Sequence, residues 1–199
     1  IENNMNLQEF ARNLQNEELY FLEEVFPSLL STWLFDHTKL LKQGSDKPKL
    51  IANRYKPVDA LAVGLLHLRD LYKVRPPSVL YRVVEEDPPA GKKYTITPNK
   101  VVGPLLSFSE SDDPFSNVEE YYDDESWLLL SWQTIPKLVL ATPDSLSQLV
   151  KDGKRLFNNA NWNKAGENLR KNQGEEECIV YVGQPLVCSW EILETDNDW

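Results

Sequence analysis

The sequence is poor in residues that several common kinds of protein need. Its 199 residues include two cysteines, Cys178 and Cys188, too few for a disulfide framework, so we expect free thiols as in a reducing compartment. No apolar run approaches the ~20 residues of a membrane span. A glycine-rich phosphate loop and a dinucleotide-binding fingerprint are also missing. These absences argue against a disulfide-stapled domain, a membrane protein and a doubly wound nucleotide-binding fold.

Positive charge is scarce as well, with 21 Lys and Arg against 31 Asp and Glu and a formal net charge of −10. An acidic surface repels nucleic-acid phosphate and anionic membranes, so we expect neither as a strong partner, although a local basic groove stays compatible with this balance. The two histidines, His37 and His67, lack a second ligand at metal-binding spacing, so we expect no metal site.

Targeting signals are not evident either. No signal-peptide pattern is present, but the sequence begins at Ile1 and not at Met, so this absence is weak evidence. The composition favours a cytoplasmic location, in a bacterial or host cytosol.

The first third of the chain is predicted to be helical. Apolar residues recur at helical spacing over residues 7–41, with a kink or a restart at Pro27. A second helical segment follows Pro57 and ends before Pro76.

From Pro77 onward the pattern changes to that of β-strands. The predicted strands cover residues 79–84, 94–97, 101–109, 127–132, 137–142, 174–182 and 186–193. A helix is expected from Pro143, followed by a polar loop over residues 158–174. Helices followed mainly by strands indicate an α+β fold with a largely antiparallel or mixed sheet. We expect a helical part at 1–76 and a β-rich core at 77–199, together in one compact domain.

Three consecutive carboxylates open the strand near the C-terminus. Side chains alternate across a strand, so Glu175 and Glu177 are predicted to share one face and Glu176 to lie on the other. Two carboxylates on one face can serve acid–base and electrostatic chemistry. The alternative is a solvated acidic turn.

Two earlier strands also carry polar residues of interest. Arg82 lies among apolar neighbours, so it either meets an anion inside the protein or reaches water from a sheet edge. Ser107 and Ser109 face one side of a later strand, and Phe108 faces the other.

The order of these motifs resembles that of a known enzyme class. An Arg on a strand, a Ser-x-Ser on a later strand and a Glu-x-Glu near the C-terminus resemble the Arg-Ser-Glu class of mono-ADP-ribosyltransferases, which includes bacterial toxins and phage enzymes. The resemblance covers residues 79–192. It implies an ADP-ribosyltransferase-like core, with helices preceding a split, mostly antiparallel sheet.

The resemblance also implies a substrate and roles for five residues. NAD would be cleaved and its ADP-ribose passed to a macromolecular acceptor, with protein arginine expected and nucleic acid a less favoured choice. Arg82, Ser107 and Ser109 would bind NAD. Glu177 would stabilise the positive charge that develops on the ribose, held by Ser107, and Glu175 would face the nucleophile. The loop at 164–174 would meet the target, with Trp162 as an aromatic contact.

Some features depart from the family pattern and leave alternatives open. Phe108 weakens the match to the serine motif, and three glutamates permit two registers. We choose the pair Glu175 and Glu177 because the apolar run 178–180 follows it. One rival is a non-enzymatic acidic protein of the immunity type that neutralises a basic partner, which six Trp and eight Tyr would suit. Another is a transferase fold that has lost its activity.

Overall fold

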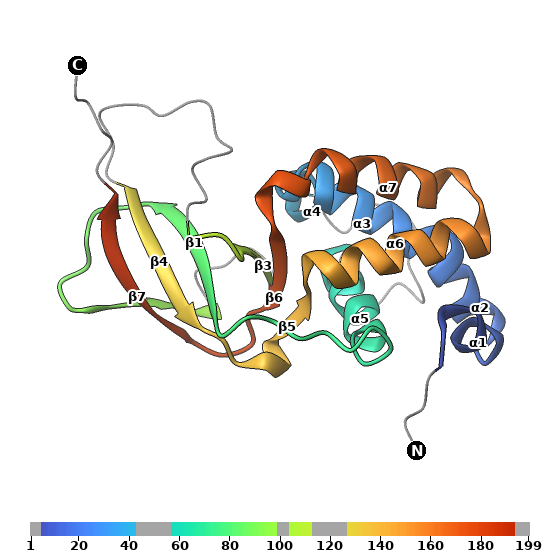
Figure 1. Cartoon of the computed structure of the whole chain (residues 1–199), viewed down its shortest axis with the longest axis horizontal. Helices are drawn as coiled ribbons and strands as arrows, with labels where there is room; N and C mark the ends of the chain where they lie inside the picture. The colour runs from blue at the N-terminus through green and yellow to red at the C-terminus, as the bar shows by residue number, and fades with distance from the viewer. Residues whose placement is uncertain (1–4, 43–56, 99–103, 113–126, 194–199) are drawn as a thin grey trace.

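A seven-stranded sheet and a cluster of helices lie side by side in the α+β fold of this chain (Figure 1). The structure is a computed structural model and describes residues 5–42, 57–98, 104–112 and 127–193. The strands follow the order β2-β7-β4-β1-β3-β6-β5, and every neighbouring pair is antiparallel. The predicted α+β class is therefore confirmed.

The predicted helical stretches are present but divided into short pieces. They are α1 (Leu7–Arg12), α2 (Asn16–Tyr20), the π-helical turn η1 (Phe21–Val25), α3 (Phe26–Phe35), α4 (His37–Lys42) and α5 (Pro57–Arg69). Pro27 lies in the first turn of α3, directly after the π-helical turn η1, so the helical stretch is irregular at this proline, as expected.

Each predicted strand has a counterpart. The strands are β1 (Val79–Glu85), β2 (Lys93–Ile96), β3 (Leu105–Ser109), β4 (Trp127–Gln133), β5 (Val139–Ala141), β6 (Glu177–Tyr181) and β7 (Leu186–Leu193). Residues 101–103 of the strand predicted at 101–109 lie outside the described residues. The strand predicted at 137–142 is short because Pro136–Leu138 forms the 3-10 turn η5.

The sheet is split between β1 and β3. β1 pairs with β4 over seven positions, from Val79 to Glu85, but it pairs with β3 at one position, where Tyr81 lies opposite Ser109. β3 in turn pairs with β6 over its whole length. The sheet therefore consists of a β2-β7-β4-β1 part and a β3-β6-β5 part that meet at Tyr81.

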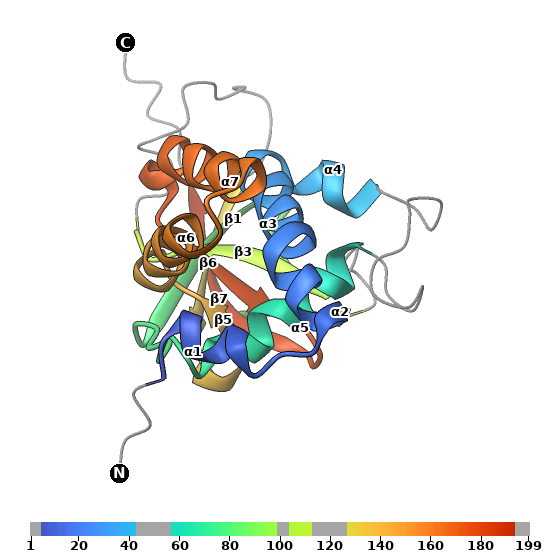
Figure 2. The ribbon, with the colours of Figure 1, turned by 90° about the vertical axis from the view of Figure 1, so that its right-hand side faces the viewer.

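Two hydrophobic cores result from this arrangement. One lies among the helices and covers one face of β3, β5 and β6 through Leu105, Ala141 and Ile179. The other gathers residues from all seven strands, among them Leu80, Phe108 and Trp132. Figure 2 shows the helices grouped over one side of the strands. Cys178 and Cys188 are free and buried in the sheet core, as predicted for reduced thiols.

The prediction of a polar loop at 158–174 is wrong. After α6 (Pro143–Phe157), residues Ala160–Lys171 form helix α7. Asn159 caps it by accepting a hydrogen bond from the N–H of Trp162 at 3.0 Å. Asn and Gly have low helix propensity, but the cap and burial of the face that carries Trp162 and Ala165 outweigh it.

The same helix corrects the expectation for Trp162. Its side chain is fully buried and packs between Phe26 and Phe157, with ring centroids 6.0 Å away in each case. It cannot serve as an exposed contact for a target. Gly153 of α6 leaves room for it, since a Cβ there would lie 2.2 Å from the indole ring.

Candidate functional site

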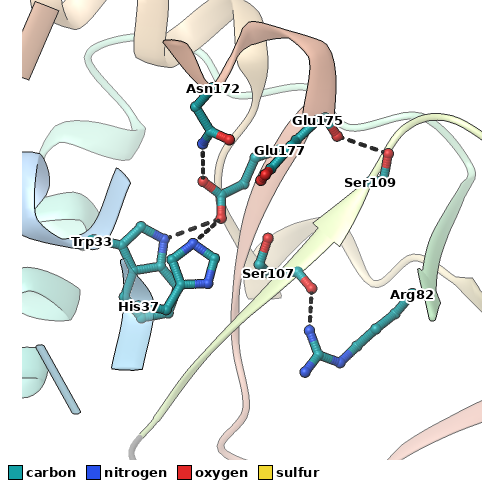
Figure 3. Close-up of polar contacts among 8 residues, drawn as sticks. All are labelled: Trp33, His37, Arg82, Ser107, Ser109, Asn172, Glu175 and Glu177. Carbon is teal, nitrogen blue, oxygen red and sulfur yellow. Dashed lines mark hydrogen bonds and ion pairs between the residues drawn. The ribbon is translucent and has the colours of Figure 1, made fainter. Parts of the chain in front are cut away.

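The three sequence motifs lie on neighbouring strands. Arg82 is on β1, Ser107 and Ser109 are on β3, and Glu177 begins β6, so the strand order β1-β3-β6 places them together in the middle of the sheet (Figure 3). Ser109 lies directly opposite Glu177. Ser109 and Glu177, 68 positions apart in the sequence, are thus neighbours across two strands.

Glu177 is buried and bound by three side chains from other elements. Its Oε2 accepts a hydrogen bond from Trp33 Nε1 at 3.2 Å and lies 2.9 Å from His37 Nε2, while its Oε1 accepts from Asn172 Nδ2 at 3.0 Å. The His37 ring stacks on Trp33, with centroids 4.2 Å apart and 15° between the planes. The Glu177 carboxylate is therefore fixed in position by α3, α4 and the end of α7.

Trp33, His37 and Asn172 were not identified as site residues from the sequence. Trp33 and His37 are four positions apart in a helical stretch, a spacing that places side chains on one face, but nothing in the sequence connects that face to Glu177. Asn172 was assigned to a loop, whereas it ends α7 and points to the carboxylate (Figure 3).

The predicted alternation of Glu175 and Glu177 along one strand is wrong. β6 begins at Glu177, whereas Glu175 ends the 3-10 turn η6 (Gln173–Glu175). Between them Glu176 has a φ of 47°, in the left-handed region, so the chain turns before the strand starts. Glu175 and Glu176 are exposed and Glu177 is buried.

Neighbouring carboxylates affect one another electrostatically. Partial burial raises the pKa of Glu175, the negative charge of Glu177 raises it further, and His37 acts in the opposite direction. Partial burial also raises the pKa of Glu110, which follows β3 and bonds the Glu176 carbonyl through its N–H. A carboxyl group with a raised pKa is better able to accept a proton at neutral pH.

The two serines have different roles in the structure. The Ser109 hydroxyl donates to the backbone carbonyl of Glu175 at 2.9 Å and accepts from the N–H of Ser111 at 3.0 Å. It therefore holds the turn that carries Glu175. Ser107 accepts a hydrogen bond from Arg82 Nη1 through its backbone carbonyl, at 2.7 Å.

Arg82 lies at the split of the sheet and not at its edge, because β1 is flanked by β4 and β3. Continuing the β1–β3 register would pair Val83 with Ser107. The strands part instead, and the Arg82 guanidinium bonds the Ser107 carbonyl (Figure 3). Burial lowers the pKa of Arg82, while Tyr94 and Glu177 act in the opposite direction.

Arg82 and Glu177 are not directly paired. Alternation places Arg82 on the face of β1 that carries Leu80, which belongs to the sheet core, whereas Glu177 shares a face with Ile179 toward the helices. Within the part of the chain that the structure describes, no ion pair joins them.

A metal site and a membrane span find no support in the described residues. Across 5–42, 57–98, 104–112 and 127–193, no group of three or more His, Cys, Asp or Glu side chains is placed to hold a metal ion. No helix within these ranges is long and apolar enough to cross a membrane.

Comparison with known proteins does not identify a relative. No protein-family model matches the chain, and neither does any curated protein or solved structure.

Proposed function

We propose that this chain is an NAD-dependent mono-ADP-ribosyltransferase of the Arg-Ser-Glu class, with an ADP-ribosyltransferase-like fold and protein arginine as its acceptor. The observation that carries the proposal is the adjacency of the three motif strands β1, β3 and β6, with the sheet split beside Arg82. The motif order in the sequence does not require this adjacency, so it is an independent support.

The residues suit the chemistry of NAD cleavage. Arg82 is held at the split by the Ser107 carbonyl through one nitrogen, and its remaining N–H groups suit the oxygens of the NAD pyrophosphate. Glu177 would stabilise the positive charge on the ribose. Its fixed donors keep the carboxylate oriented, so little reorganisation is needed when that charge develops.

The reaction would break the bond between ribose and nicotinamide, with the electron pair leaving on the nicotinamide. A nitrogen of the acceptor arginine would then bond to the ribose carbon. Its proton would pass to Glu175, an exposed carboxylate whose pKa is raised by partial burial and by the charge of Glu177. Ser109 supports this step indirectly, by holding the backbone of Glu175.

His37 marks the approach to the carboxylate. The Glu177 side chain is 3% exposed, whereas that of its partner His37 is 31% exposed. The ribose would therefore reach Oε2 from the side of His37, displacing this ring or packing on it.

One observation favours a second candidate, the non-enzymatic acidic binding protein. Both carboxylate oxygens of Glu177 are already bound, which is also what a structural buried carboxylate requires. In this case the net charge of −10 would act on a basic protein partner, and Glu177 would serve stability alone.

Nicotinamide release from NAD, with and without a cell lysate, distinguishes the two. We expect release by the wild type, loss in Glu177→Gln, and retention in the matched control Glu176→Gln, whose side chain is exposed. Labelled NAD in the lysate then identifies the acceptor. No release, together with no NAD-dependent shift in melting temperature, would overturn the proposed enzymatic function. The search would then turn to a basic protein partner.

A further inference from the structure

Positive charge is concentrated on the hairpin of α6 and α7. These two helices carry six cations, namely Lys151, Lys154, Arg155, Lys164, Arg170 and Lys171, against the three carboxylates Asp144, Asp152 and Glu167. Two of the carboxylates are engaged locally. Asp152 accepts from Tyr72 and Gln148, and Glu167 pairs with Lys171 at 3.3 Å. The hairpin is thus a basic surface on an acidic protein.

Three of these cations line one groove between the helices. Its volume is about 270 Å³, and Lys151, Lys154 and Arg170 surround it together with the polar side chains of Ser147 and Gln173. Neither an acidic nor an aromatic side chain is among its described lining residues. A groove with this lining attracts an anion by charge and hydrogen bonds, and it offers no ring on which a nucleic-acid base could stack.

Gly166 gives the groove its shape. A Cβ at this position would lie 2.9 Å from Lys154 Cδ, 3.4 Å from Lys154 Nζ and 3.3 Å from Val150 Cγ1. The stem of Lys154 therefore lies across α7 in the space that a larger residue would fill. This packing places the Lys154 ammonium group over α7, at the groove that Arg170 also lines.

The groove lies next to the proposed acceptor side of the active site. Gln173 lines the groove and begins η6, the turn that ends at Glu175. Two residues span at most about 7 Å of chain. The short turn therefore separates a positive groove from a negative surface formed by Glu175 and Glu176.

We infer that this groove binds an anionic side chain of the protein acceptor, either a carboxylate or a phosphorylated residue, next to the arginine that receives ADP-ribose. The inference rests on the proposed function. A segment with an arginine beside an acidic residue matches both surfaces, since the arginine faces Glu175 and the anion faces Lys154 and Arg170. A long polyanion such as a nucleic acid fits less well, because the rest of the chain is strongly acidic.

The test measures peptide binding without NAD, by the fluorescence anisotropy of labelled peptides. Each peptide carries one arginine, flanked at varied spacing by Asp, Glu or phosphoserine, with Gln and Ser in the matched neutral peptides. We expect the wild type to prefer the anionic peptides, and the double variant Lys154→Gln/Arg170→Gln to bind them at least about tenfold more weakly, with a shallower salt dependence. The neutral peptides should be unaffected.

The control is a second double variant on the same hairpin. Arg155→Gln/Lys164→Gln removes the same charge outside the groove and should retain the preference. Gly166→Ala keeps every charge but displaces Lys154, and should weaken binding by a smaller factor. An equal loss in both double variants, or no preference in the wild type, would overturn the inference. Tighter binding of a single-stranded oligonucleotide than of any peptide would do the same.

The outcome for the groove is separable from that for the enzyme. Lys154 and Arg170 are outside the proposed catalytic residues, so Lys154→Gln/Arg170→Gln should retain NAD cleavage with water as acceptor while it loses transfer to anionic peptides. Absence of NAD cleavage in the wild type overturns the proposed function. Peptide binding is read independently, so it supports or refutes the anion site in either case.

Discussion

Replacing Glu177 tests the site and the fold together. In Glu177→Ala the buried donors Trp33 Nε1 and Asn172 Nδ2 lose their acceptor, and His37 loses its partner. Each unsatisfied buried donor costs about 1–3 kcal/mol, so the two buried donors together predict a loss of about 2–6 kcal/mol in the free energy of unfolding. A domain is stable by about 5–15 kcal/mol, so this variant can lose much of its folded population.

Glu177→Gln should be far milder. Its remaining carbonyl oxygen can accept from Trp33, and its new amide can donate to Asn172 if the Asn172 amide turns to present its oxygen. What is lost is chiefly the added strength that a charged acceptor gives these bonds, about 1–2 kcal/mol. The Gln variant is therefore the one to use for nicotinamide release, because Ala would confound activity with folding.

Urea denaturation of both variants, followed by tryptophan fluorescence and far-UV circular dichroism, measures the two losses. Glu176→Gln serves as the control, since this side chain is exposed and the substitution should change stability by less than about 0.5 kcal/mol. A loss below about 1 kcal/mol in Glu177→Ala would refute the buried network. It would also remove the reason for regarding this carboxylate as oriented.

Three further predictions concern α6, α7 and the carboxylates. Gly153→Ala should lower the free energy of unfolding by about 1–3 kcal/mol, seen in urea denaturation, because a Cβ would meet the ring of Trp162. In the same measurement, Asn159→Ala should lower the free energy of unfolding by about 1–2 kcal/mol, because α7 loses its cap. The control Asn163→Ala changes an exposed residue within that helix and should not lower the free energy of unfolding. The raised pKa of Glu175 means that the folded protein binds the proton of this carboxyl group more tightly than the unfolded chain does. The protonated Glu175 therefore contributes to stability at acidic pH. This contribution is lost as the pH rises from the ordinary range of a glutamate through the raised pKa. Glu175→Gln should therefore raise the melting temperature relative to the wild type more at neutral than at acidic pH, and an equal difference at both would contradict the raised pKa.

The strands could be predicted because their local patterns are unambiguous. The alternation and β-branched content of 79–84 and 186–193 identify β1 and β7 closely, and Pro136 explains why β5 starts late. The order of the motifs also predicted that Arg82 and Glu177 belong to one region. That inference came from resemblance, since no local pattern specifies which strands become neighbours.

The features that could not be predicted from the sequence depend on tertiary structure. α7 is rich in Asn and includes Gly166, so its propensity favours a loop, and only the cap and the burial of Trp162 make it a helix. The left-handed turn at Glu176 is likewise invisible in a run of three glutamates. The bonds to Glu177 join residues up to 144 positions apart, for which a single sequence carries no signal.

The helices are part of the site, whatever their order in the chain. Asn168 of α7 donates to both the carbonyl and the hydroxyl of Ser31 in α3, at 3.0 and 2.8 Å, and both residues are buried. This contact links the N-terminal helices to the hairpin that leads into β6. Trp33 and His37 reach Glu177 from α3 and α4, so the position of these two partners depends on how the helices pack against the sheet. The chemistry proposed for Glu177 therefore depends on helix packing as much as on the strand that carries it.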